Sequence, residues 1–546
     1  MKSLRRKILF GVTAIIFLFA AFLVATHYQA KHSVDAYRKT LIAQGEKLSI
    51  SELIPPAPTN GPNGAPALLA ARLYSFNYDV QPSVMKFLAP GRARVSWMQE
   101  IEPSEKSTNI WPALRTLLDQ NTEALAEVRV ALNSDTLRFD LSYDQGFKLL
   151  LPHLAQLKDI SQWLSAATVM ELHQGNASAA FENLQACIAL PRVYDNEPLM
   201  ISQFVRIAMG AIALGATWGA LQFPTWTDDQ LALLQTAWAG YQPRTAMENV
   251  FGMERAMGRM TFDDARLSYY KKDALWGFRT PNTNSVIGDL REAREELMSD
   301  PLEGLRNIYL RFPHYWAWKW WWSYDEELHS IRLWQTAIEA ARLAGKMNSF
   351  GAAIAHLEAQ EQRLQPTNSG AASFFDFFTE MEGSPAKGYL RKVAAAQTQR
   401  EMVVTAIALK RYYLRHGKYP AALAELSPIY LRELPIDWMD GKPLRYRLKE
   451  NGQFLLYSVG EDRKDDGGDA SVPGRSFYFW HGKDAVWPLP ATAAEIAADN
   501  AAMEKERKKH ENATKPFAPS LNMSEELRRR YGLTIPTNTS ATNSPK

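Results

Sequence analysis

The sequence has few of the residues and motifs on which catalytic or metal-binding sites are commonly built. It contains one cysteine, Cys187, so an intrachain disulfide is excluded. Because this thiol lies in the apolar helical run ENLQACIAL, we expect it to be buried rather than nucleophilic. The ten histidines are scattered, and HLEAQE at His356 lacks the second histidine of the H-E-x-x-H zinc motif.

The usual catalytic signatures are also missing. The Gly-x-Ser-x-Gly, Walker and dinucleotide-binding glycine patterns do not occur. SPAK, Ser384–Lys387, matches the S-x-x-K motif of penicillin-binding proteins, but its partner motifs S-D-N and K-T-G are absent. Pro385 favours a helix start that Ser384 caps. Paired carboxylates such as Asp263-Asp264 and Glu295-Glu296 are typical of solvated helix surfaces. We therefore predict no catalytic residue, and a non-enzymatic role is favoured.

A strong excess of either charge is absent too. The 62 Lys and Arg residues nearly balance the 59 Asp and Glu residues, which leaves a net charge of +3. Since the basic residues form no stripe with interleaved aromatic residues, we expect no nucleic-acid partner. The hydrophobic content of 46% is typical of a globular protein, and 546 residues suffice for two or more domains.

The N-terminus combines a basic cluster with a long apolar run. Lys2, Arg5, Arg6 and Lys7 precede an uncharged run over residues 8–25, which approaches the ~20 residues needed to cross a bilayer. The positive-inside rule keeps the basic cluster in the cytoplasm. We predict a single-pass protein of the inner (cytoplasmic) membrane with its N-terminus inside and the bulk of the chain in the periplasm. A cleaved signal peptide is the alternative, but VATHYQA offers a poor cleavage site.

Helical periodicity dominates most of the remaining chain. LLPHLAQLKDISQWLSAATVMEL and SAAFENLQACIAL place apolar residues at i, i+3, i+4 and i+7. Gly175 between them suits a helix end, and Asn176 or Ser178 can cap the next helix. This predicts one hairpin of the tetratricopeptide type, but no second copy follows at a fixed period.

The segment FPHYWAWKWWWSYDEELHSIRLW, Phe312–Trp334, allows two interpretations. Its aromatic residues could form a membrane-interface belt or a ligand groove, since tryptophan is favoured at such boundaries. Alternatively, they fill the core of a helical domain, which is the commoner role of aromatic residues on one helix. The second interpretation is favoured.

The pattern changes at Tyr389. A long apolar-faced helix ends at Gly417, and Pro420 opens a short helix, PAALAEL. PLRYRLKE then alternates strictly, Asn451-Gly452 is a strong hairpin signal, and QFLLYSV forms the returning strand. SFYFW and DAVWPLP are further strand candidates. These signals predict a small antiparallel sheet packed on a long helix.

We therefore predict a mostly α fold made of five parts. They are residues 1–30 (basic cap and transmembrane anchor), 31–66 (short helix and Pro/Gly-rich linker), 67–387 (all-α helical domain), 388–490 (small α+β module of a long helix and an antiparallel sheet) and 491–546 (charged helix and disordered tail).

The C-terminal motif RYYLRHGKYPAALAELSPIYLRELPIDWMDGKPLRYR, with FLLYSVGEDRKDDGGD and DAVWPLP, resembles the C-terminal half of the major pseudopilin of type II secretion. Over residues 37–56, 144–222 and 398–490, the chain resembles an uncharacterised family of membrane-anchored envelope proteins of planctomycete-type bacteria. That family has no activity to transfer. The N-terminus departs from a prepilin, because Ile16 stands where the glutamate five residues after Gly11 is expected. Polymerisation into a pseudopilus is therefore not expected.

The pseudopilin resemblance implies a calcium loop between two strands. Its oxygen ligands would be Ser458, Asp462, Asp465, Asp466 and Asp469. The loop departs from the pseudopilin pattern, since Arg463 replaces an expected glycine and the pair Gly467-Gly468 is shifted by one position. The spacing does not fit an EF-hand. We therefore predict a structured loop between strands with solvated carboxylates, and calcium binding is the alternative.

Three classes of function remain open. The favoured one is a membrane-anchored, extracytoplasmic interaction or scaffold protein that binds the membrane through its N-terminal helix and other proteins through its helical body. The second is a component of type II secretion related to pseudopilins. The third is an extracytoplasmic hydrolase whose site is assembled from residues distant in sequence. Calcium is the one cofactor that the sequence suggests.

Overall fold

The computed structural model is mostly helical, as predicted, with a few small sheets. It describes residues 2–56, 61–71, 73–74, 81–82, 85–95, 97–98, 110–269, 286–306, 308–309, 312–364, 385–472 and 479–513. Ser384 and the predicted disordered tail after residue 513 lie outside these residues.

The helices and helical turns follow one another along the chain. Their bounds are α1 Lys2–Ala43, α2 Ile50–Leu53, α3 Ala65–Ala70, α4 Ile110–Gln120, α5 Thr122–Ala131, η2 Tyr143–Lys148, α6 His153–His173, α7 Ala177–Ala189, η3 Leu190–Tyr194, α8 Met200–Leu221, α9 Asp228–Gly240, η4 Pro243–Ala246, α10 Met247–Leu267, α12 Val286–Ser299, α13 Pro301–Arg306, α14 Phe312–Ala317, η6 Trp318–Trp322, α15 Ser323–Met347, α16 Phe350–Leu364, α17 Pro385–His416, η7 Leu423–Leu426, η8 Phe479–His481 and α18 Ala493–Ala513.

The chain divides into two compact units. The first holds residues 1–98 and 109–490, and the second holds residues 99–108 and 491–546. In the second unit, the helix that the structure describes is α18. Its start is capped by two hydrogen bonds, since the amide of Thr492 donates to the Glu495 carboxylate and the amide of Glu495 donates to the Thr492 hydroxyl. In the first unit, α17 packs against α8 and α9, so the long helix of the predicted C-terminal module is part of the helical body. The division into five parts stays a prediction.

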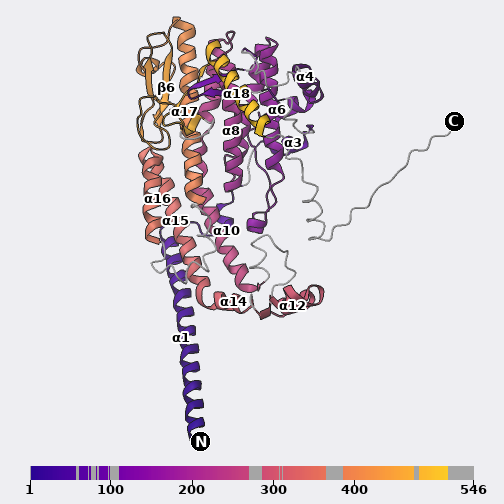
Figure 1. Ribbon diagram of the computed structural model, residues 1–546, viewed down its shortest axis with the longest axis vertical. Helices are drawn as coiled ribbons and strands as arrows, with labels where there is room; N and C mark the ends of the chain where they lie inside the picture. The colour runs from indigo at the N-terminus through magenta and orange to yellow at the C-terminus, as the bar shows by residue number, and fades with distance from the viewer. Residues whose placement is uncertain are drawn as a thin grey trace, which may run out of the picture. The chain divides into compact units, whose positions relative to one another are not determined.

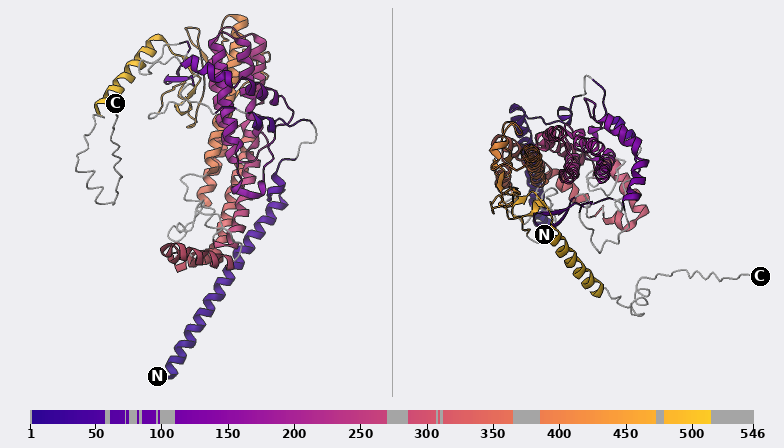
Figure 2. Two further views of the ribbon diagram at one scale, coloured as in Figure 1. Left: turned by 90° about the vertical axis from the view of Figure 1, so that its right-hand side faces the viewer. Right: turned by 90° about the horizontal axis from the view of Figure 1, so that it is seen from above.

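The first helix, α1, changes character along its length. From Phe10 onward it is long and apolar enough to cross a membrane, and its apolar window is not buried by the rest of the chain. Beyond Ala30 it packs against α15, where Val34 and Leu41 contact Leu328 and Ile331. Figures 1 and 2 show the N-terminal part of α1 extending away from the other helices of its unit. The helix α8 passes the same length and composition test, but it is mostly buried and forms part of the core.

The helical core is built from α6, α7, α8, α9 and α17 with α10, α15 and α16 beside them (Figure 1). The predicted hairpin is present as α6 and α7, with Gly175 in the left-handed conformation at φ +81° and Asn176 at the cap position of α7. Trp163, Trp218 and Trp238 are fully buried at the centre. Trp218 donates its indole N–H to the carbonyl of Pro488 at 3.0 Å, which fastens the C-terminal strands to α8.

The sheets are small and lie mainly beside α17 (Figure 1). Their strands are β1 Lys86–Ala89, β2 Arg92–Arg94, β3 Ile436–Asp437, β4 Lys442–Pro443, β5 Arg445–Leu448, β6 Phe454–Ser458, β7 Ala485–Val486 and β8 Leu489–Pro490. The predicted hairpin at Asn451-Gly452 is present, since antiparallel β5 and β6 flank it and β7 extends the sheet. Gly452 has the left-handed φ of +76° that this turn requires.

Two expectations are corrected. The all-α expectation for residues 67–387 fails at β1 and β2, which form an antiparallel hairpin whose second strand pairs in parallel with β8. SFYFW does not end in a strand, because Phe479–His481 form a helical turn; Ser476 to Tyr478 lie outside the described residues. The predicted helix start at Pro385 is confirmed, since α17 begins there.

Candidate functional site: the acidic loop and a polar groove

The acidic loop follows β6, and its carboxylates act mainly as acceptors for its own backbone. The carboxylate of Asp462 accepts from the amide of Lys464 at 3.0 Å, and that of Asp469 accepts from the amide of Ser471 at 2.9 Å. The carboxylate of Asp465 accepts from the amide of Gly467 and from the hydroxyl of Tyr457, both at 3.0 Å. Such side-chain turns fix the loop without a ligand.

Two buried aspartates organise the loop, and sequence reasoning missed both. Asp484, which is fully buried, accepts from the amides of Gly468 at 2.7 Å, Asp469 at 3.2 Å and Asp466 at 3.4 Å. Burial raises the pKa of the Asp484 carboxyl, and these amides act against that shift. The backbone amide of Asp466, rather than its carboxylate, therefore contributes to the loop.

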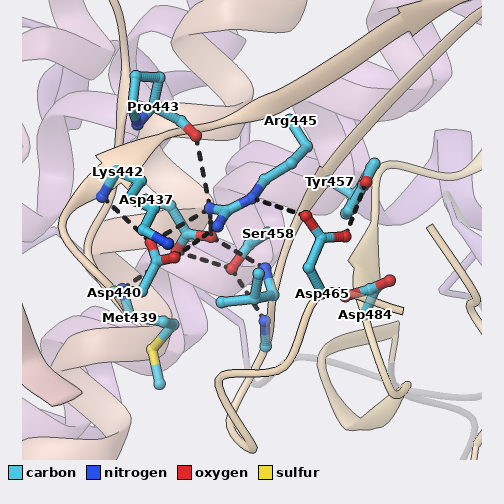
Figure 3. A network of polar contacts seen from close by, with 12 residues as sticks. Asp437, Met439, Asp440, Lys442, Pro443, Arg445, Tyr457, Ser458, Asp465 and Asp484 are labelled. Atoms are coloured by element: carbon cyan, nitrogen blue, oxygen red, sulfur yellow. Dashed lines mark hydrogen bonds and ion pairs between the residues drawn. The ribbon is translucent and has the colours of Figure 1, made fainter. Parts of the chain in front are cut away.

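The second is Asp437, also fully buried, at the end of β3 (Figure 3). Its carboxylate accepts from the hydroxyl of Ser458 at 2.9 Å and from the amides of Val459 at 2.9 Å and Met439 at 3.0 Å. Burial raises the pKa of Asp437, while these hydrogen bonds favour the carboxylate. Ser458 is thus a buried structural residue that links β6 to β3.

Arg445 joins the network to the acidic loop (Figure 3). Its guanidinium donates to Asp437 at 2.9 Å, pairs closely with Asp440, and lies 3.5 Å from the carboxylate of Asp465. One cation thus connects β3, the turn before β4 and the loop after β6. The signal that could have indicated this role is the strict alternation of β5, which places Arg445 on the polar face.

The five predicted calcium ligands do not converge on one point. Among the residues that the structure describes, no three His, Cys, Asp or Glu side chains form a group that could hold a metal ion. Lys483 pairs with Asp469 at 2.9 Å and lowers the pKa of that carboxyl to about 2. The loop is a structured turn in this geometry, and calcium binding stays a prediction.

Gly468 and Arg463, where the loop departs from the pseudopilin pattern, each fit the backbone conformation at their position. Gly468 has φ +85°, and a Cβ built there would lie 2.6 Å from the side chain of Leu455, so only glycine fits. Arg463 adopts a left-handed φ of +61°, the conformation that a glycine would take without strain. Its guanidinium donates to the carbonyl of Gly351 at 2.9 Å, which holds it there.

A polar groove of about 800 Å³ lies between α9, α17, η4 and the segment 430–438. Three buried polar atoms in its wall have no hydrogen-bond partner within the described part of the chain: Nε of Arg244, Nε1 of Trp438 and Oε1 of Gln397. The guanidinium of Arg244 lies over the Trp438 ring, 4.8 Å from its centroid. All three atoms are closed off from the groove itself, so they belong to its wall and are not surfaces that a ligand would touch.

The arginines of the groove outnumber its acids. Arg400 pairs with Glu401 and Arg411 pairs with Asp228 at 2.7 Å. Arg244 and Arg432 make no ion pair with any described residue, which leaves positive charge in the groove. Sequence reasoning missed this site, since its residues come from segments about two hundred positions apart.

A smaller cavity of about 330 Å³ lies beside the buried pair His153 and Glu197. The imidazole Nε2 is 3.3 Å from a Glu197 oxygen that also accepts from Ser202. The carboxylate stands between the imidazole and the hydroxyl, whereas nucleophilic catalysis needs the imidazole in that place. This cluster therefore does not match a Ser-His-acid triad.

Comparison of the chain with protein-family models, with curated proteins and with solved structures finds no match. The resemblance to the envelope-protein family and to the pseudopilin therefore stays a prediction.

Proposed function

We propose that the protein is a single-pass membrane protein with a cytoplasmic N-terminus, and that its body, outside the cytoplasm, binds another protein in the polar groove. The anchoring is supported by the exposed apolar part of α1 and by the basic residues before it. The binding is supported by the volume of the groove and by the positive charge that Arg244 and Arg432 leave in it.

The groove chemistry favours an extended peptide segment as the ligand. A peptide backbone offers both N–H and C=O groups, so it can pair with an amide side chain that has a donor and an acceptor. Asn348 supplies such an amide in the groove lining, whereas the amides of Gln235 and Gln242 already form hydrogen bonds within the chain. An acidic side chain of the segment would complement Arg244, whose planar guanidinium suits a carboxylate.

Site-specific photocrosslinking in intact cells tests this proposal. A benzophenone amino acid replaces Ala239, an exposed residue of α9 in the groove wall, and the matched control replaces Leu233, which is exposed on the same helix but outside the groove. We expect one discrete crosslinked partner from position 239 and none from 233, with mass spectrometry locating the crosslink in a short segment of that partner.

Variants of Arg244 test whether the crosslinked partner is bound in the groove itself. Arg244→Ala should abolish the crosslink from position 239, and Arg244→Lys should retain part of it because the charge remains but the fork of donors is lost. Equal crosslinking from both positions, or a crosslink that is insensitive to Arg244→Ala, contradicts binding in the groove.

A pseudopilin-related role in secretion is the second candidate. It is supported by the succession of the long helix α17 and the antiparallel sheet β5, β6 and β7. The same crosslinking experiment separates the two, since a partner that belongs to the secretion apparatus favours this second role.

A further inference from the structure

The helices α12, α13 and α14 and the turn η6 lie where α1 leaves the rest of its unit. Figures 1 and 2 show α12 and α14 running across the direction of α1, at the level where the exposed N-terminal part of α1 begins. Contacts define this level: the His27 ring lies 4.6 Å from the Trp320 ring, and His27 Nδ1 is 2.9 Å from the Trp320 carbonyl. His27 lies just beyond the uncharged run of residues 8–25, so Trp320 lies near the outer end of the predicted span.

Large apolar side chains are exposed on these helices. Ile287 and Leu302 are 81% and 82% exposed, and Leu290, Met298 and Tyr309 are each more than half exposed. On α12, Ile287, Leu290 and Met298 share one helical face. A soluble surface seldom gathers so many large apolar side chains, and such a patch marks an interaction site.

The other face of α12 explains why this patch is directed outward. Ala293 and Glu296 are buried, and α12 packs against α13 so closely that a Cβ at Gly304 would lie 2.4 Å from the Leu297 backbone. Glu296 projects opposite to Ile287 and Met298 around the helix. The pair α12 and α13 therefore has a packed side that includes Ala293 and Glu296 and an exposed apolar side.

The tryptophan-rich segment contains both buried and exposed rings where it approaches α1. Tyr315 and Trp318 are buried against Phe262 and Ala265 of α10, in agreement with the core interpretation. Trp320 instead is 46% exposed beside His27. An exposed tryptophan next to a membrane span is typical of the bilayer interface, where its apolar ring and its N–H are both accommodated.

We propose that the apolar side of α12 and α13, together with Trp320, lies in the interfacial region of the bilayer that α1 enters. The lipid surface is the occupant of this patch, and the proposal rests on the membrane anchoring proposed above. Amphipathic helices of this kind bury their apolar face about 5–10 Å into the boundary between headgroups and acyl chains. The body would thereby be held against the membrane by two contacts instead of one.

Spin-label depth measurements on the full-length protein in lipid nanodiscs test the proposal. Leu302→Cys carries the label in the patch, and Ile429→Cys, 67% exposed, is the matched control. Position 429 is far from α1, because the adjacent Tyr430 packs on Tyr412 near the end of α17 that is farthest from α1. The native Cys187 is fully buried, so it stays unlabelled. We expect the label at 302 to be reached preferentially by oxygen and the label at 429 by a water-soluble nickel complex.

A third label at Phe17→Cys, in the exposed apolar part of α1, separates this proposal from the anchoring on which it depends. A label at 17 within the bilayer and a label at 302 as accessible to nickel as that at 429 overturn the surface contact and leave the anchor intact. If neither label enters the bilayer, both proposals fail. Strong dipolar coupling between two copies labelled at 302 shows that a second chain covers the patch, which also overturns lipid contact.

Discussion

Replacement of Asp437 by alanine should loosen the sheet next to the acidic loop. The carboxylate accepts four hydrogen bonds, from the Ser458 hydroxyl, the amides of Val459 and Met439, and the guanidinium of Arg445. Alanine accepts none of them. Since Asp437 is fully buried, water cannot replace the lost acceptor without disturbing β3 and β6.

The expected cost follows from these four contacts. Breaking a buried ion pair by removing one partner costs about 3–5 kcal/mol, and each orphaned buried donor accounts for roughly 1–3 kcal/mol of such a loss. We expect Asp437→Ala to destabilise this part of the structure by about 4 kcal/mol. If the Val459 amide exchanges through local opening, its exchange rate should then rise about a thousandfold.

Hydrogen exchange read by mass spectrometry on peptides that cover β6 measures this effect. The matched control is Asp462→Ala, which removes one hydrogen bond from an exposed turn of the same loop and should change the exchange of β6 little. If exchange in β6 rises no more in Asp437→Ala than in Asp462→Ala, the buried carboxylate does not hold β3 and β6 together.

Arg445 provides a second test of the same reasoning. Asp437→Asn should be destabilising because the guanidinium of Arg445 loses the one fully buried carboxylate among its three partners, while Asp440 and Asp465 remain beside it. Because Asp437 and Arg445 contact each other directly, the double variant with Arg445→Met should be more stable than the sum of the single effects predicts. Additive effects would show that the two side chains do not act as a pair.

Three further predictions concern other parts of the chain. Burial raises the pKa of Glu254 to about 7 from 4.5, so the folded state binds the carboxyl proton more tightly than the unfolded state does. The free energy of unfolding should therefore fall by about 3 kcal/mol as the pH rises from about 4.5 to 7. Glu254→Gln should remove this pH dependence, which urea unfolding midpoints measure. Burial raises the pKa of Cys187 to about 12, so maleimide should label it only after unfolding; labelling of the native protein would contradict the buried position. Thermal melts in millimolar calcium and in chelator should coincide, because the loop carboxylates already accept protein hydrogen bonds; a calcium-dependent rise that Asp465→Ala abolishes would establish the metal site.

Local signals predicted the elements whose partners are close in sequence. The hairpin of β5 and β6 depends on a turn at Asn451-Gly452, and the hairpin of α6 and α7 depends on a glycine that can adopt a positive φ. Both can be recognised without knowing the rest of the fold. The parallel pairing of β2 with β8 could not be, since Arg92 pairs with Leu489, about four hundred positions away. The hairpin of β1 and β2 is local and was nevertheless missed.

The two candidate sites also differ in how far the sequence reveals them. The acidic loop was recognisable because its carboxylates are consecutive, but its function as a turn depends on Asp484 and Asp437, which approach it only in the folded chain. The groove left no mark in the sequence, because Arg244, Gln397 and Trp438 come from three segments and are ordinary residues in each. What brings them together is the fold, which places all three in the wall of one groove.

The tryptophan-rich segment shows why composition alone could not choose between a core and an interface. Trp318 donates to Glu326 at 2.7 Å and is 3% exposed, whereas Trp320, two residues later, is 46% exposed beside His27. Neighbouring positions on a helix point in different directions, so one aromatic run can serve both environments. Trp318 packs with Phe262 and Ala265 of α10, whereas Trp320 lies against His27 of α1. If the label at position 302 lies in lipid, Trp320 belongs to the same interface, and the two interpretations of the segment apply to different residues of it.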